Sequence, residues 1–151
     1  MAQSLSKLYV HIIFHIKHRE VPIRQNTANE LYAYIGAIIK DNESIPIQIN
    51  GIHDHIHILC VMSKNITLSH LVEEIKRHSS RWIKTKGLYY RKFFWQKGYA
   101  AFSVSPSVHD RTLEYIANQE QHHKKRTFQD EYLLFLKEYG IEYDEAFLWS
   151  D

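Results

Sequence analysis

The sequence has one cysteine, three prolines and five glycines in 151 residues. A single cysteine excludes a disulfide within the chain and a zinc site built from several cysteines. No apolar run approaches the roughly 20 residues that a membrane-spanning helix needs, and the first residues lack the layout of a secretory signal, so we expect a cytoplasmic protein. The net charge of +2 is too small to indicate a nucleic-acid partner by itself.

The apolar content is that of a globular domain, with 44% hydrophobic and 13% aromatic residues. At this length such a chain can bury one core. No repeat, low-complexity segment or linker divides it. We therefore predict a single domain over residues 1–151, with a core at about 5–125 and a C-terminal helical extension at about 126–151.

The most informative stretch is Gly51-Ile52-His53-Asp54-His55-Ile56-His57-Ile58-Leu59-Cys60, which has the alternation of a strand. Successive strand side chains point to opposite faces, so His53, His55 and His57 share one face and the isoleucines share the other with Cys60. Imidazoles about 6.5 Å apart at their Cα atoms can lean toward one metal ion. The common alternative is a half-exposed histidine on a sheet, because the chain has 11 histidines.

Hydrophobic periodicity predicts the order strand, helix, strand, strand, helix, strand. Strands are expected at residues 5–17, 45–49, 52–60 and 95–104, and helices at residues 27–41 and 68–83. Asn50-Gly51 predicts a tight hairpin turn between the two middle strands. The order is that of the α+β, ferredoxin-like (split βαβ) fold, a four-stranded antiparallel sheet with two helices on one face. The histidine face would be left open for a ligand or partner.

Two more helices are expected near the C-terminus. Ser107 and Asp110 resemble a capping arrangement for a helix that runs to about Lys125. Thr127 is expected to cap a short helix over residues 128–139, which Gly140 closes.

A tyrosine and a glutamine lie one turn apart in the first of these helices. Tyr115 and Gln119 share a face, which alone is typical of a solvated helix edge. Together with the histidine strand they supply a nucleophile and three neutral metal ligands, namely His55, His57 and the amide oxygen of Gln119.

These motifs resemble the HUH nucleases, and among them the single-tyrosine transposases of the small insertion-sequence group. His55-Ile56-His57 resembles the histidine-hydrophobe-histidine strand of those enzymes, and Tyr115-x-x-x-Gln119 resembles their nucleophile helix. The resemblance extends to Tyr9-Val10-His11-Ile12-Ile13-Phe14, Leu71-Val72-Glu73-Glu74-Ile75-Lys76-Arg77-His78-Ser79-Ser80-Arg81 and Phe94-Trp95-Gln96-Lys97-Gly98-Tyr99.

The resemblance implies an enzyme that cuts single-stranded DNA with the hydroxyl of Tyr115, forming a 5′-phosphotyrosine and freeing a 3′-hydroxyl. His55, His57 and Gln119 would hold Mg²⁺ or Mn²⁺, which polarises the scissile phosphate. Because two imidazoles and an amide bring no negative charge, we expect the ion to bind loosely until DNA completes its shell. Such enzymes recognise a DNA hairpin near the element ends, act as homodimers and need no nucleotide cofactor. In a bacterial cytoplasm the protein would lie at the nucleoid when bound to DNA.

Positively charged side chains of the second helix are candidates for DNA contacts. The expected residues are Lys76, Arg77, Arg81 and Lys84, together with Arg111 and Tyr99. The alternative for each is a solvated helix surface.

Three other interpretations stay open. The histidine strand approximates the histidine-triad nucleotide hydrolases, but Asp54 breaks the alternation that their pattern requires. A non-catalytic module that binds single-stranded nucleic acid on its open sheet face would need a pair of aromatic residues where this chain has histidines. A domesticated relative that acts on dispersed repeats of its host genome would keep the same chemistry.

Overall fold

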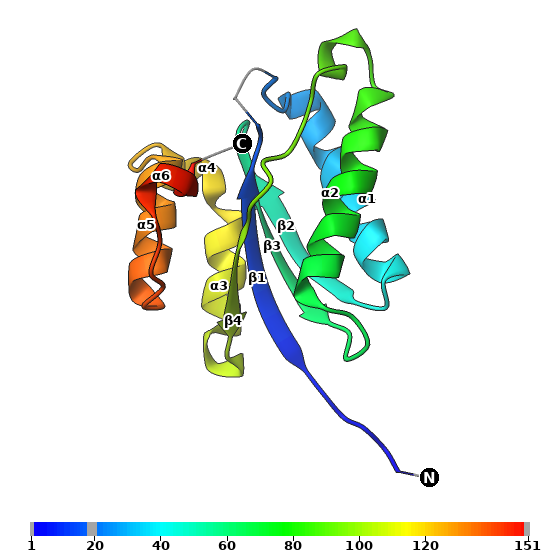
Figure 1. Cartoon of the computed structure of the whole chain (residues 1–151), viewed down its shortest axis with the longest axis vertical. Helices are drawn as coiled ribbons and strands as arrows, with labels where there is room; N and C mark the ends of the chain where they lie inside the picture. The colour runs from blue at the N-terminus through cyan, green and yellow to red at the C-terminus, as the bar shows by residue number, and fades with distance from the viewer. Residues whose placement is uncertain (1, 18–20, 150–151) are drawn as a thin grey trace.

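The computed structural model describes residues 2–17 and 21–149. A four-stranded antiparallel sheet lies between two layers of helices (Figure 1). Its strands are β1 (Leu8–His15), β2 (Ile45–Gly51), β3 (His55–Met62) and β4 (Ala100–Val104). Their spatial order is β2-β3-β1-β4, which is the split βαβ topology. The ferredoxin-like prediction is therefore confirmed.

The first helical layer covers one face of the sheet. It consists of α1 (Gln25–Asp41) and α2 (Leu68–Lys84), and Leu88–Tyr90 forms the short 3₁₀ turn η1 after it. Thr67 caps α2, since its side chain accepts a hydrogen bond from the backbone of His70. Alternate strand residues such as Phe14, Ile56 and Ile58 are fully buried beneath these helices, as is Cys60. None of the helices in the described ranges is long and apolar enough to cross a membrane.

The second helical layer covers the histidine face. It consists of α3 (His109–Ala117), α4 (Gln119–His123), α5 (Phe128–Glu138) and α6 (Glu145–Leu148), preceded by the 3₁₀ turn η2 (Pro106–Val108). Figure 1 shows α3 to α6 on the side of the sheet opposite α1 and α2. The prediction of an open face is therefore wrong, because Ile13 and Phe102 of this face pack against Phe128, Tyr132 and Leu136 of α5.

The predicted Asn50-Gly51 turn is also wrong. Both residues belong to β2, neither has a positive φ, and the chain reverses over residues 52–54. A Cβ on Gly51 would collide with the backbone oxygen of His55 and lie 2.9 Å from Cα of Ile56, so this glycine permits close strand approach. His53 lies in the loop with an exposed side chain and is not on the ligand face of the strand.

Asn50 also accounts for a break in the helix that was predicted to run to Lys125. Its side-chain amide donates to the backbone oxygens of Ile116 and Ala117, at 3.0 and 3.2 Å. The predicted helix to Lys125 is interrupted just after these carbonyls, at Asn118, because the asparagine competes for acceptors that a continuous helix would use.

Two ends of elements differ from the sequence prediction. The fourth strand starts at Ala100, and Trp95 makes only an isolated bridge to Ile16. No side chain caps α3, and Ser107 is hydrogen-bonded to Ser105 instead. By contrast, Thr127 caps α5 as predicted.

Replacing Gly51 by alanine should destabilise the fold by about 1–3 kcal/mol, the usual cost of overpacking. The reason is that the strand pair must separate to admit the methyl group. Urea unfolding would measure the change. Gly36→Ala is the matched control, because its Cβ would lie 3.8 Å from the nearest atom and a helical glycine gains about 0.5–1 kcal/mol on becoming alanine. Equal stability of the Gly51 variant and the wild type would refute the close-approach argument.

Candidate active site

Two buried histidines lie at the start of β3. Ile56 and Ile58 point into the core, so the alternation of the strand directs His55 and His57 to the opposite face. Both rings are completely shielded from solvent. In the β1–β3 ladder, Ile13 is paired with His57, and directly paired side chains share a face of the sheet.

The Nδ1 atom of each histidine is held by a neighbour. His55 Nδ1 lies 2.8 Å from Oδ1 of Asp54, and His57 Nδ1 lies 2.8 Å from Nε2 of His11. The Nε2 atoms of both rings remain directed toward the C-terminal helices. Partners of this kind fix the ring orientation and tautomer of histidines that bind metals.

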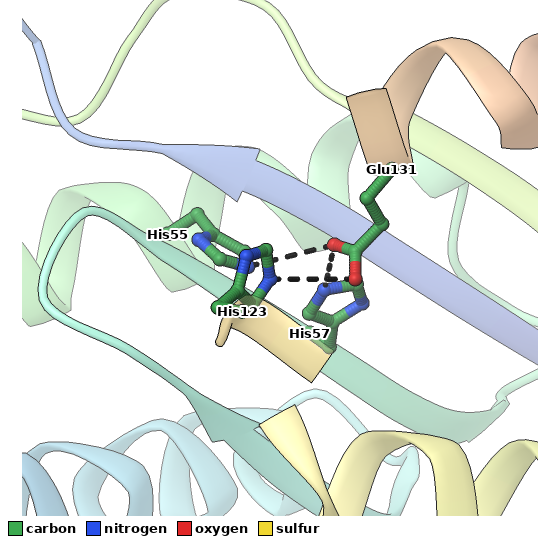
Figure 2. A group of neighbouring side chains, drawn as sticks. All are labelled: His55, His57, His123 and Glu131. Atoms are coloured by element: carbon green, nitrogen blue, oxygen red, sulfur yellow. Dashed lines mark hydrogen bonds and ion pairs between the residues drawn. The ribbon is translucent and has the colours of Figure 1, made fainter. Parts of the chain in front are cut away.

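A carboxylate from α5 lies between these rings, as Figure 2 shows. Glu131 is 2% exposed, and its Oε1 lies 2.8 Å from Nε2 of His57 and 3.6 Å from Nε2 of His55. His123 of α4 places its Nε2 3.4 Å from the other oxygen, Oε2. One ligand atom from each of the four residues lies within 4.8 Å of all the others, so the group could hold a divalent metal ion.

The predicted tyrosine and glutamine reach the same place. Gln119 is fully buried, and its Oε1 lies 3.2 Å from Nε2 of His55. The hydroxyl of Tyr115 donates a hydrogen bond to Oε2 of Glu131. Tyr115, Gln119 and both histidines of the sequence prediction therefore meet within one chain.

Burial and charge set the protonation states of this site. Burial chiefly lowers the pKa of His57 to about 4, and burial with the neighbouring His57 holds the pKa of His11 well below its usual value. Burial opposes ionisation of Glu131, but the imidazoles of His123, His55 and His57 outweigh it and hold the pKa of this carboxyl well below its ordinary range. Glu131 is therefore ionised at neutral pH.

The carboxylate of Glu131 raises the pKa of both Tyr115 and His55. Burial and then the charge of Glu131 raise the pKa of Tyr115 above its ordinary value. Burial alone would lower the pKa of His55, but the hydrogen bonds to Asp54 and Glu131 raise it overall. The tyrosine therefore stays protonated at neutral pH, and a partner that withdraws the carboxylate would make its hydroxyl easier to ionise.

The sequence interpretation missed Glu131 and His123. It described the site as free of negative charge, whereas the structure places a buried carboxylate in it. One signal was present in the sequence: Glu131 shares a helix face with Phe128 and Phe135, at spacings of three and four residues. A carboxylate on the apolar face of a helix indicates a buried polar partner.

The predicted DNA contacts divide into separate groups. Lys76 is used internally, since its Nζ donates to the backbone oxygens of Gln96 and Gly98 at 2.8 and 2.6 Å and burial lowers its pKa to about 8. Arg77 pairs with Glu74 on the surface of α2. Both residues belong to α2, which lies on the side of the sheet opposite α3, the helix that carries Tyr115 (Figure 1).

The remaining candidates of α2 and the loop after it are placed as follows. Arg81 is exposed, Lys84 lies over the ring of Phe94 at 4.0 Å, and Tyr99 is partly buried against the core. Arg111 is the one predicted contact that lies near the tyrosine, on the exposed side of α3.

A cavity of about 740 Å³ opens beside the tyrosine. Its lining includes Arg111, Tyr115, Arg126, Glu131 and Lys137. Three cationic side chains and two anionic ones, Glu131 and Glu138, thus line the cavity beside Tyr115. The small excess of positive charge is suited to an anionic substrate.

Comparison with known proteins agrees with these motifs. The family model "Transposase IS200 like" matches residues 4–119, which is most of the chain and includes the histidine pair, Tyr115 and Gln119. The chain belongs to the IS200-like transposase family. This membership supports an enzymatic role in cutting DNA, and the group of three histidines and Glu131 fits a divalent metal ion.

Solved structures share the fold of this transposase. A candidate transposase from Deinococcus radiodurans R1 is 21% identical with a TM-score of 0.60, over 79% of this chain and 98% of its own. A REP-associated tyrosine transposase bound to a REP hairpin is 14% identical with a TM-score of 0.57, over 82% of this chain and 74% of its own. No curated protein sequence matches the transposase closely enough to count as a relative.

Stability should fall as the pH drops from 6.5 to 5. Below pH 6.5 the unfolded chain takes up protons at His11 and His57 that the folded chain refuses, because their folded pKa values are lowered. The slope is about 1.4 kcal/mol per pH unit for each such proton. The stability that His55 gains from its raised pKa is already complete below pH 6.5 and leaves this slope unchanged.

Urea unfolding at several pH values measures the slope. Replacing His11 by phenylalanine should lower the slope of unfolding free energy against pH by the contribution of about one proton. His70→Asn, a change at an exposed histidine of α2, should leave the slope unchanged. A slope that is the same in the wild type and the His11 variant would contradict the neutral state of His11.

Proposed function

We propose that this transposase cuts and rejoins single-stranded DNA through a 5′-phosphotyrosine on Tyr115, with the help of a divalent metal ion. The observation that carries the proposal is the convergence of three groups on one buried point: the tyrosine hydroxyl, the Nε2 atoms of His55 and His57, and the amide oxygen of Gln119. A nucleophile beside a set of metal ligands is the arrangement that metal-assisted phosphoryl transfer requires.

The phenolic oxygen of Tyr115 attacks the scissile phosphorus. A bond forms between that oxygen and phosphorus as the phenol loses its proton, and the bond from phosphorus to the 3′ oxygen breaks. The 3′ oxygen gains a proton, so the departing strand leaves with a 3′-hydroxyl. Rejoining is the same exchange in reverse, in which a 3′-hydroxyl attacks and Tyr115 leaves. The number of phosphodiester-type bonds is unchanged, so no nucleotide cofactor is needed.

His55, His57 and Gln119 would hold Mg²⁺ or Mn²⁺ in this reaction. When bound, the ion polarises the scissile phosphate and offsets the charge that develops on it. Asp54 and His11 keep the two imidazoles in place through their Nδ1 atoms. The cavity beside Tyr115 would receive the strand next to the nucleophile.

The DNA partner is proposed to be a hairpin with an adjoining single strand. One structural neighbour is bound to a hairpin. This chain has cationic side chains on α2 and, separately, beside the cavity. Arg77, Arg81 and Lys84 of α2 lie far from the tyrosine and suit the hairpin, whereas Arg111 beside the cavity suits the strand to be cut. Lys76 and Tyr99 would act indirectly, by fixing the loop before β4. Nζ of Lys76 donates to the backbone oxygen of Gly98 in this loop and lies over the ring of Tyr99.

A homodimer in the cytoplasm, at the nucleoid when bound to DNA, remains part of the proposal. The same chemistry also serves a domesticated relative that acts on dispersed repeats, and the hairpin-bound neighbour is named as REP-associated. Tyr115 lies beside the histidines of its own chain, so a single chain holds all the groups of the proposed reaction.

A protein–DNA adduct on a denaturing gel tests the nucleophile. Wild-type protein with Mn²⁺ and single-stranded DNA spanning the element ends should form the adduct. Tyr115→Phe should abolish it because the attacking oxygen is gone. Tyr34→Phe should not, because it makes the same change in α1, where Tyr34 stacks on Trp82 of α2. An adduct that survives in the Tyr115 variant would show that the nucleophile is misassigned.

Salt dependence tests the surface of α2. Arg81→Ala should weaken hairpin binding and reduce the slope of log K against log salt by about 1, as expected for the loss of one phosphate contact. Lys40→Ala removes an exposed cation at the end of α1 and should leave the slope unchanged. Fluorescence anisotropy at several salt concentrations gives both values, and identical slopes for the two variants would remove Arg81 from the interface.

A further inference from the structure

We propose that Glu131 and His123 join His55 and His57 as the four ligands of a closed Zn²⁺ site, which holds the transposase at rest before DNA binds. The inference deepens the proposed function and rests on it for His55 and His57 as metal ligands. What it adds is a second ligand set for the same position, supplied by α4 and α5.

The spacing of the four ligand atoms fits one ion. Zinc–nitrogen and zinc–oxygen bonds of about 2.0–2.1 Å place the corners of a tetrahedron about 3.3 Å apart. Oε1 of Glu131 lies 2.8 Å from Nε2 of His57 and 3.6 Å from that of His55, and Oε2 lies 3.4 Å from Nε2 of His123. Small side-chain rotations bring these atoms to the required separation, since all of them already lie within 4.8 Å of one another.

The surroundings of the ligands also fit a metal. Coordination through Nε2 leaves the ring proton on Nδ1, where His55 can donate to Asp54 and His57 to His11. His123 has a side chain only 7% exposed, and its Nε2 makes no hydrogen bond to any residue that the structure describes. This nitrogen and Oε2 of Glu131, 3.4 Å apart, are at the separation expected of two ligands of one zinc ion.

The donor set selects the class of metal. Three imidazoles and one carboxylate suit Zn²⁺, whereas Mg²⁺ prefers oxygen ligands and keeps several of its waters. The set built from His55, His57 and Gln119 brings no charge, but Glu131 brings one negative charge into the buried site. The DNA-free chain should therefore bind zinc far more tightly than the three neutral ligands would.

The same carboxylate accounts for the resting state. Oε2 of Glu131 accepts the hydrogen bond of the Tyr115 hydroxyl, so the nucleophile is engaged and protonated. A DNA phosphate also offers anionic oxygens, and it must displace Glu131 to reach both the ion and Tyr115. Glu131 and His123 lie beyond residues 4–119 and so outside the segment that the family model covers.

Metal binding without DNA tests this inference. The full chain is stripped with a chelator and titrated with Zn²⁺ by calorimetry and with Co²⁺ by visible absorption. We expect one ion per chain, and the intense Co²⁺ spectrum of a four-coordinate site. Glu131→Gln and His123→Asn should each weaken zinc binding by more than about 100-fold, beyond the effect of losing an outer partner.

Matched controls are Glu138→Gln, the same change on the exposed part of α5, and His70→Asn on α2, and both should bind zinc like the wild type. Circular dichroism checks that each variant folds. If Glu131→Gln does not fold, His123→Asn gives the decisive comparison, because it leaves the carboxylate in place.

Wild-type zinc affinity in both site variants would overturn the inference, as would the weak spectrum of six-coordinate Co²⁺. A loss of affinity in Gln119→Ala alone would assign the ion to the three neutral ligands instead. The proposed function is judged separately by the Tyr115 adduct: an adduct without the zinc site refutes only the resting state, and a zinc site without an adduct refutes only the transposition chemistry.

Discussion

The burial of alternate residues of β3 is the constraint on which the rest of this structure depends. Ile56 and Ile58 are fully buried under the first helical layer, so the rings of His55 and His57 must lie on the other face. β3 pairs with β1 in a fixed register. A slip of this pairing by one residue would turn the histidines toward the apolar core. The position of the site therefore follows from the packing of side chains that do no chemistry.

Polar groups buried on the histidine face need partners, and this need ties the C-terminal helices to the sheet. An ionised carboxylate away from water is costly unless it is paired and hydrogen-bonded. Glu131 meets the condition through His57, the hydroxyl of Tyr115 and the nearby His123. Aromatic packing adds to the attachment, since Phe128 stacks on His55 with ring centroids 4.2 Å apart. The C-terminal helices therefore contribute side chains to the candidate active site as well as covering it.

The sequence predicted most of the elements and the central residues of the site, because both depend on local patterns. Period-two alternation located β3. The spacing of four residues singled out Tyr115 and Gln119, although the break at Asn118 places them in α3 and α4 and not on one continuous helix. Predictions that depended on distant contacts were less successful. Asn50-Gly51 is typical of hairpin turns but forms the end of β2. Asn50 is hydrogen-bonded there to the backbone of α3, and Gly51 permits the close approach of β3. His53 left the ligand face because the strand begins two residues later, at His55.

By itself the sequence determined the split βαβ order, the pair His55 and His57, and a tyrosine helix after the fourth strand. These follow from hydrophobic periodicity and side-chain direction, which are properties of neighbouring residues. Only the tertiary structure decided that the histidine face is covered and that Glu131 and His123 complete the cluster there. These residues lie more than 60 positions after the histidine strand, and no local pattern fixes how helices of an extension pack on a distant sheet. Long-range packing, which buries Phe128 and Glu131 together, made that decision.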